Sequence, residues 1–167
     1  PTEKPEQQSS TVDFMAYGTT EGQFALSVSP NIFFSNNTYR LNASFYANYW
    51  QANYFQIGNN SSDDHEEYDS TDYGLNLTLE RRFFDFLIVD VVGRYINTDM
   101  DIIDGGLLAA GNIHGVEDGE YIGAGLAFGY DSRDNTNAPA KGVLTRYEYI
   151  TYDEDIGSTL DFDIQTL

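Results

Sequence analysis

The chain has 167 residues, with 8 Lys and Arg against 27 Asp and Glu, and its formal net charge is −19. Such acidity argues against nucleic-acid binding, because the phosphates would be repelled. Cysteine is absent, which excludes disulfides and thiol catalysis, and the 13 Tyr and 11 Phe argue against a disordered chain. No apolar run approaches the roughly 18 residues that a membrane-spanning helix needs.

The chain begins with a polar segment and continues as one domain. Pro1–Ser10 is polar and contains proline, so residues 1–11 are predicted to be a flexible leader or linker. Residues 12–167 are predicted to form a single domain. No signal peptide is visible, so an exported protein would have lost it or carry it outside this sequence.

Apolar and polar residues alternate along most of the domain. In Thr38–Trp50 every odd position from Tyr39 to Tyr49 is apolar or aromatic, and Ser70–Arg82 repeats the pattern. Successive side chains of a strand point to opposite faces, so each segment is predicted to be a strand with one apolar and one polar face. Similar patterns predict strands at Gly22–Phe34, Phe86–Asn97, Glu120–Asp131, Gly142–Tyr152 and Leu160–Leu167, with a weaker candidate at Val12–Tyr17.

These segments are long enough to cross a bilayer as strands, which takes roughly 9–11 residues each. The connections alternate in length: Ser35–Asn37 and Phe83–Asp85 are short, whereas Gln51–Asp69 and Thr98–Gly119 are long. Short turns at one end and long loops at the other are typical of bacterial outer-membrane barrels, with the long loops outside the cell. The predicted fold is therefore all-β, an antiparallel meander transmembrane β-barrel with seven or eight strands present.

Charge follows the same division. The stretches Gln51–Asp72 and Thr98–Glu120 contain acidic residues and no Lys or Arg, whereas the basic residues lie near the short turns. Arg94 is expected to point into the lumen. The acidic set is Asp63, Asp64, Glu66, Glu67, Asp69, Asp72, Asp99, Asp101, Asp104, Glu117, Asp118 and Glu120, with Asp153, Glu154 and Asp155 in the next loop. The basic set is Arg40, Arg81, Arg82, Arg133, Lys141 and Arg146.

One stretch carries a family resemblance. A glycine-rich strand that includes Gly125 ends in Tyr130-Asp131-Ser132-Arg133-Asp134-Asn135, and Pro139-Ala140-Lys141-Gly142 follows. This resembles the bacterial surface antigen family, the barrel shared by BamA-like and TamA-like proteins. There a strand ends in Tyr-Asp-Thr/Ser-Arg-Asp-Asn and a Pro-x-Lys-Gly turn follows. The segment 54–59 also looks like the family's Tyr-Tyr-Gly-Ile-Gly-Asn, with Gln56 in place of a glycine.

The resemblance implies a non-enzymatic role in inserting or translocating proteins at the bacterial outer membrane. The implied partners are outer-membrane lipid, lipopolysaccharide, client outer-membrane proteins and an assembly complex, with no cofactor. Family barrels have about 16 strands and a late Val-Arg-Gly-Phe-like motif that this chain lacks. We therefore expect it to be the first part of a larger barrel.

The residues of the motif also predict a local structure. Asp131, Asp134 and Asn135 can hydrogen-bond nearby backbone, and Arg133 can pair with Asp131 or Asp134. Pro139 blocks strand pairing and Gly142 gives the turn its conformational freedom. The turn is then either a purely structural feature or a periplasmic contact site. The strand glycines, Gly125 among them, leave room in the lumen or let the strand bend.

Other candidate sites carry weaker signals. The loop residues Asp63, Asp64, Glu66, Glu67 and Asp69 offer carboxylates to a divalent cation, or form a solvated acidic loop. His65 and His114 stand outside any metal motif, and no catalytic constellation is present, so no enzyme is expected.

Two other readings remain open. One is a complete eight-stranded barrel with a structural or adhesive surface role, in which the last strand would pair with Val12–Tyr17. The other is a soluble β-sandwich or lipocalin-like binding protein.

Overall fold

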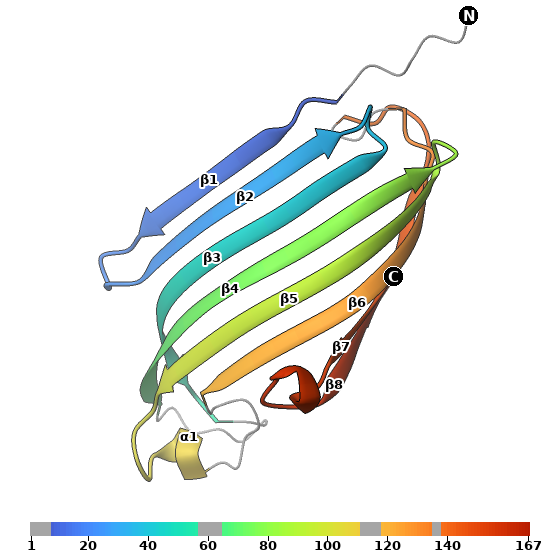
Figure 1. Ribbon diagram of the computed structural model, residues 1–167. Coiled ribbons are helices and arrows are strands. Elements are labelled where there is room, and N and C mark those ends of the chain that lie inside the picture. Colours follow the sequence, from blue (N-terminus) through green and yellow to red (C-terminus); the bar gives the residue numbers. More distant parts are fainter. Residues whose placement is uncertain (1–7, 57–64, 111–117, 135–137) are drawn as a thin grey trace, which may run out of the picture.

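The computed structural model describes residues 8–56, 65–110, 118–134 and 138–167. They form one sheet of eight antiparallel strands in sequence order, each hydrogen-bonded to the next (Figure 1). The all-β antiparallel meander is therefore confirmed. The strands are β1 (Thr11–Gly18), β2 (Phe24–Phe34), β3 (Tyr39–Tyr54), β4 (Glu66–Phe83), β5 (Leu87–Asp101), β6 (Gly119–Asp131), β7 (Leu144–Tyr152) and β8 (Phe162–Thr166).

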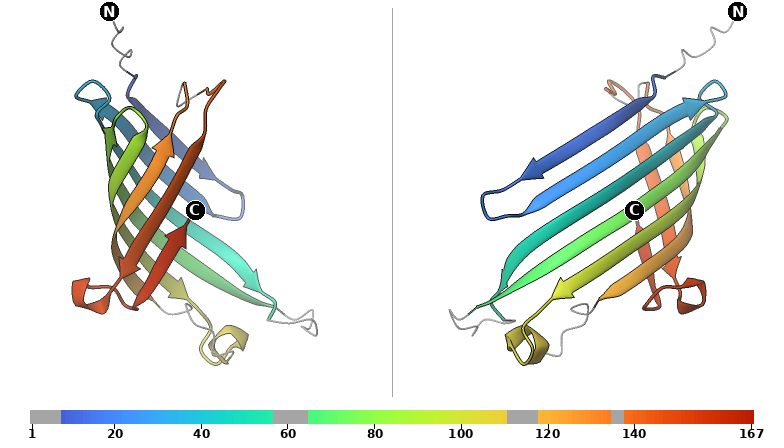
Figure 2. Two further views of the ribbon diagram at one scale, coloured as in Figure 1. Left: turned by 90° about the vertical axis from the view of Figure 1, so that its right-hand side faces the viewer. Right: turned by 60° about the vertical axis from the view of Figure 1, so that its left-hand side comes forward.

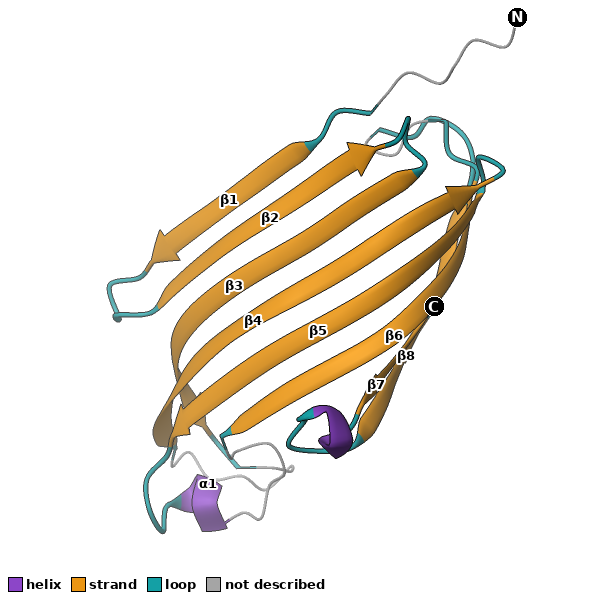
Figure 3. Ribbon diagram, viewed as in Figure 1, coloured by secondary structure: helices purple, strands orange, loops and turns teal. Residues whose placement is uncertain are grey.

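Helix is confined to two short pieces at the long-loop end of the strands, α1 (Leu107–Ala110) and a 3₁₀ turn at Glu154–Ile156 (Figure 3). In the described part of the chain, no helix combines the length and apolar character that a membrane crossing requires. The fold is therefore determined by strand pairing and by the contrast between the two faces of the sheet.

Each predicted strand is present, but the central strands are longer than the alternation indicates. β3 and β4 pair as far as Tyr54 opposite Glu66, and β5 continues to Asp101 opposite Asp69. At the long-loop end, β3, β4 and β5 therefore stay paired beyond the point where the apolar alternation ends. The predicted loops Gln51–Asp69 and Thr98–Gly119 are correspondingly shorter.

The sheet is bent into a trough. Figure 2 shows β6, β7 and β8 curling round to face the first strands. The strand order ends at β1 on one side and β8 on the other, and these two strands do not pair, so the sheet is open. The pairing that a closed eight-stranded barrel requires is therefore not present in this structure.

The two faces of the sheet differ in polarity. Leu75, Leu77 and Leu79 of β4 lie on the convex face and are exposed, whereas Glu80 lies on the concave face and is buried. The register aligns the convex residues across strands, so that Leu79 pairs with Val91 of β5. We call the convex set the apolar belt; its exposed members are Val12, Phe14, Leu26, Ile32, Phe45, Leu75, Leu77, Leu79, Val91, Leu126 and Phe128.

Aromatic pairs lie at both ends of this belt. At the short-turn end the ring of Phe34 is 5.4 Å from that of Tyr39. At the long-loop end the ring of Phe24 is 6.0 Å from that of Tyr49, and those of Tyr73 and Tyr95 are 6.1 Å apart. Tyr49 lies ten residue steps beyond Tyr39 along β3, which is about 33 Å at roughly 3.3 Å per residue.

The concave face holds a small apolar cluster beside its polar groups. Val92, Ile150 and Tyr152 are buried together, and the inner face of β6 gives them space because it carries glycine. A Cβ atom at Gly125 would overlap the backbone oxygen of Tyr149. This agrees with the expectation that the glycine-rich strand leaves room inside.

The last strand reverses the polarity of the others. Phe162 pairs with Tyr152 and stacks on its ring at 4.3 Å, on the concave side. Asp163 lies opposite Thr151 and Gln165 opposite Tyr149, on the convex side. The apolar belt therefore fades from β6 to β8, although the alternation within residues 160–167 looks like that of the other strands.

Candidate functional site

The motif turn is organised around Asp131, the last residue of β6. Arg133 folds back so that Nε lies 2.9 Å from Asp131 Oδ1 and Nη2 lies 3.1 Å from Oδ2. Arg82 of β4 donates to the same Oδ2 at 3.0 Å. Of the two predicted partners of Arg133, Asp131 makes the contact described here. The hydrogen bond from Arg133 to Asp131 raises the pKa of the Arg133 guanidinium.

Asp134 closes the outer part of the turn, as the sequence predicts. Its Oδ1 accepts hydrogen bonds from the backbone N–H groups of Ala140 at 3.0 Å and Lys141 at 3.2 Å. Gly142 has a φ of 103°, and a Cβ atom there would overlap the Ser132 carbonyl, so only glycine fits without strain. Pro139 is exposed outside the strand ladder, and Asn135 lies outside the described residues.

A second charged group crosses the strand that precedes the turn. Arg146 of β7 reaches over β6, its Nε 2.7 Å from Asp90 Oδ2 of β5, and its Nη2 is 2.7 Å from Glu148 Oε2. Arg94 is 3.4 Å from the other oxygen of Glu148, so it lies on the concave face as predicted. Ala127 of β6, opposite Asp90 and Glu148, is fully buried.

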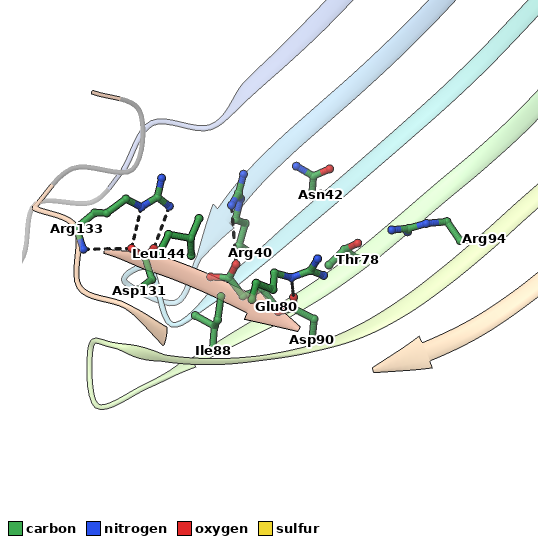
Figure 4. Close-up of a pocket in the computed structure, with 11 residues that line it drawn as sticks. Arg40, Asn42, Thr78, Glu80, Ile88, Asp90, Arg94, Asp131, Arg133 and Leu144 are labelled. Atoms are coloured by element: carbon green, nitrogen blue, oxygen red, sulfur yellow. Dashed lines mark hydrogen bonds and ion pairs between the residues drawn. The ribbon is translucent and has the colours of Figure 1, made fainter. Parts of the chain in front are cut away.

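Together the two groups form what we call the trough cluster. Glu80 joins them, 3.8 Å from Arg40 and 3.6 Å from Arg82. Most of these side chains line one cavity of about 270 Å³ at the short-turn end of the trough (Figure 4). The trough cluster consists of Arg40, Arg82, Arg94, Arg133, Arg146, Glu80, Asp90, Asp131 and Glu148.

The cluster depends on the bend of the sheet. Four strand spacings of ~4.8 Å, about 19 Å, would separate β3 from β7 in a flat sheet. Arg40 of β3 and Arg146 of β7 nevertheless line the same cavity. Each of the four carboxylates is ion-paired with arginine, an arrangement that fixes the side chains and stabilises the curved inner surface.

The arginine and carboxylate partners from β4, β5 and β7 were not predicted from the sequence. Asp90 lies in a strand of mostly apolar residues, and its Arg146 partner is 56 residues away. The available signals were a charged residue in an apolar strand, and the small inward residues of β6 that leave space for a long side chain to cross. Neither signal identifies Arg146 as the partner of Asp90 unless the curvature of the sheet is known.

Two carboxylates of the acidic loop accept hydrogen bonds from other parts of the chain. Glu66 is buried at the start of β4, and its Oε2 accepts the backbone N–H groups of Leu107 and of Leu108, the latter at 3.3 Å. Asp69 accepts a hydrogen bond from the Tyr49 hydroxyl at 2.9 Å, and Glu67 is exposed. No group of three potential metal ligands occurs among the described residues. Asp63, Asp64 and His114 lie outside them.

The remaining motif residues lie on both faces of β6. Tyr130 is on the convex face with its ring 5.6 Å from that of Phe86, whereas Gly125 is on the concave face.

Comparisons of the chain with protein-family models, with curated proteins and with solved structures give no match. The surface antigen resemblance therefore stays a prediction from the motif residues.

Proposed function

We propose that this chain forms part of a β-barrel of a bacterial outer membrane, and that it acts there in the insertion or translocation of other proteins without enzymatic chemistry. The observation that carries the proposal is the apolar belt. A water-soluble sheet would cover such a face with a second layer, yet in the described residues Leu77, Val91 and Phe128 stay exposed.

The dimensions of the belt support a bilayer as its surroundings. The roughly 33 Å from Tyr39 to Tyr49 becomes about 25 Å along the membrane normal for a strand tilted by ~40°, which is the height of the apolar band of an outer-membrane barrel. Aromatic residues at both limits of the belt match the interfacial girdles of such proteins. The polar trough on the other face is suited to a wet lumen.

The location of charge supports an orientation. The long-loop end is acidic and the arginines gather near the short turns. We therefore propose that the acidic loops face the outside of the cell, where lipopolysaccharide and its divalent counterions lie. Outer-membrane lipid and lipopolysaccharide are the proposed partners of the belt and of its outer rim.

The role in protein insertion or translocation depends on the family resemblance, and two backbone features support it. Gly142, the glycine of the Pro-x-Lys-Gly turn, has a positive φ of 103°. Gln56, which stands where the family has glycine, also has a positive φ, 70°. Two motif positions therefore have the backbone conformation that favours glycine.

Heat-modifiability tests the membrane part of the proposal. The urea-unfolded protein would be diluted into detergent micelles and, in parallel, into plain buffer, and both samples would be run on a gel with and without boiling. We expect folding, or lasting solubility, only in detergent, because the belt needs an apolar solvent. A monodisperse, folded protein in plain buffer would contradict the proposal.

The insertion role needs a separate assay. Vesicles containing the protein would receive a urea-unfolded client barrel, and the appearance of the protease-resistant, heat-modifiable client would be followed with time. Vesicles with a barrel that lacks the motif turn serve as the control. Faster client insertion in the first sample is expected. Equal rates of client insertion in the two samples would contradict the insertion role but not the membrane location.

A further inference from the structure

Two turns at the short-turn end share one backbone hydrogen bond and a positive φ at their two central residues, but they differ in length and sequence. In the β2–β3 turn, Thr38 N–H donates to the Ser35 oxygen at 3.2 Å; in the β4–β5 turn, Phe86 N–H donates to the Phe83 oxygen at 3.3 Å. The two central residues of each turn have positive φ. These angles are 54° and 65° at Asn36 and Asn37, and 52° and 63° at Phe84 and Asp85. In the first turn Ser35 has a positive φ as well, 52°.

Phe84 is unexpected at this position. Two central residues with positive φ are best supplied by Asn, Asp or Gly, and a bulky residue there is a genuine outlier. Asn36 follows this preference, so the local backbone alone would favour asparagine at position 84 as well. Phe84 is also 78% exposed, so burial within the chain does not compensate for the strained backbone.

The ring of Phe84 is linked through Phe86 to the aromatic side chains of the convex face. It lies 6.2 Å from the ring of Phe86, which in turn lies 5.6 Å from that of Tyr130 on the convex face. On the same face Arg81 places its guanidinium 4.4 Å from the Phe83 ring. Aromatic rings beside an arginine suit the boundary between acyl chains and phosphate headgroups.

We propose that Phe84 is a membrane anchor, whose ring enters the headgroup–acyl boundary of the phospholipid leaflet on the short-turn side. The inference deepens the proposed membrane function and rests on it. The lipid is favoured over a protein partner because the ring is continuous, through Phe86 and Tyr130, with the apolar belt. Burial of the ring in the lipid then offsets the strained backbone of the turn.

Depth-dependent quenching of a single tryptophan tests this anchor. Trp50 is the only native tryptophan, so W50Y provides a background into which F84W or L77W is placed. Each protein would be folded into vesicles whose lipids carry bromine either near the headgroup or deep in the acyl chain. We expect F84W to lose most fluorescence with the shallow label, and L77W, in the apolar belt, to lose most with a deeper label.

The two positions separate the anchor from the membrane proposal. If L77W is quenched and F84W is unaffected by every brominated lipid, the anchor is wrong while the membrane function stands; a protein partner would then be the remaining occupant. If neither tryptophan is quenched, the membrane proposal fails and the anchor with it. F84N places at position 84 the residue type of Asn36, so this variant should still fold. The anchor predicts weaker bilayer insertion of F84N, whereas a role of Phe84 in the turn alone predicts no loss of insertion.

Discussion

At the scale of single residues, Asp131 accepts hydrogen bonds from several donors at once in the motif turn. One carboxylate accepts from two arginine side chains and from the backbone N–H of Arg133 at 3.2 Å. It is also almost fully buried. A buried charge with this many donors stabilises the fold only while all partners remain, because removing one partner leaves the others uncompensated.

The variant D131N tests this role. Loss of the charge leaves Arg82 and Arg133 without their carboxylate, and we expect the free energy of unfolding in detergent to fall by about 3 kcal/mol. D134N is the matched control, because the asparagine oxygen can still accept the backbone N–H groups of Ala140 and Lys141. Equal unfolding midpoints in a urea titration of the two variants would contradict the assignment.

Glycine at position 125 should be indispensable. A Cβ atom there would overlap the Tyr149 backbone oxygen, so G125A is expected to separate β6 from β7 and lower the free energy of unfolding by roughly 2 kcal/mol or more. G93A is the control, since its nearest neighbour, Leu77 Cβ, is 4.0 Å away. Urea unfolding in micelles would measure the free energy of unfolding of both variants. If G125A is as stable as G93A, β6 and β7 lie further apart than described here.

The site was predictable only where its contacts are local. The sequence offered Asp131 and Asp134 as partners of Arg133 because both lie within two residues of it, and it offered the backbone hydrogen bonds of Asp134 through turn chemistry. Arg82 and Arg146 reach partners 49 and 56 residues away, and in both contacts one strand lies between the partners' strands. Such contacts depend on curvature, which an alternation of residue types does not encode.

At the scale of elements, the inner face of β6 leaves space for a contact that crosses it. Its small residues, with Ala127 fully buried, let Arg146 span from β7 to Asp90 on β5. We infer that this ion pair holds three neighbouring strands in a curved arrangement. A pair that bridges two strand spacings constrains the bend more directly than contacts between adjacent strands.

A double-mutant cycle of D90L and R146L measures that constraint. R146L leaves the buried Asp90 without its partner and should lose about 3 kcal/mol of unfolding free energy. D90L should lose less, because Arg146 is partly exposed and keeps its ion pair with Glu148. The double variant should lose clearly less than the sum of the two. The same cycle on Arg40 and Glu80, whose charges are 3.8 Å apart, serves as the comparison and should show weaker coupling. Additive losses at Asp90 and Arg146 would contradict the proposed strand tie.

Strand existence was predicted better than strand ends and faces. The alternation located all eight strands because one face of each strand is apolar over its middle. It failed at Glu66–Asp69 and at Thr98–Asp101, where both faces are polar yet pairing continues. It also could not show that Phe162 faces the trough, because a one-residue difference in register exchanges the two faces.

At the scale of the whole molecule, polarity is arranged opposite to that of a water-soluble domain. The concave side carries five arginines and four carboxylates in ion pairs, and the convex side carries the exposed apolar belt. The proposed function requires an apolar medium to cover the convex side. A bilayer supplies such a medium over the height that the aromatic pairs delimit.

The most direct test of that claim uses the absence of cysteine, which permits single spin labels without background. Labels at positions 75 to 79 of β4 in vesicles would be compared for collisions with oxygen, which concentrates in lipid, and with a water-soluble nickel chelate. We predict a period of two, with oxygen favoured at Leu75, Leu77 and Leu79 and the chelate favoured at Asn76 and Thr78. Chelate access at all five positions, or no alternation, would contradict a lipid-facing belt.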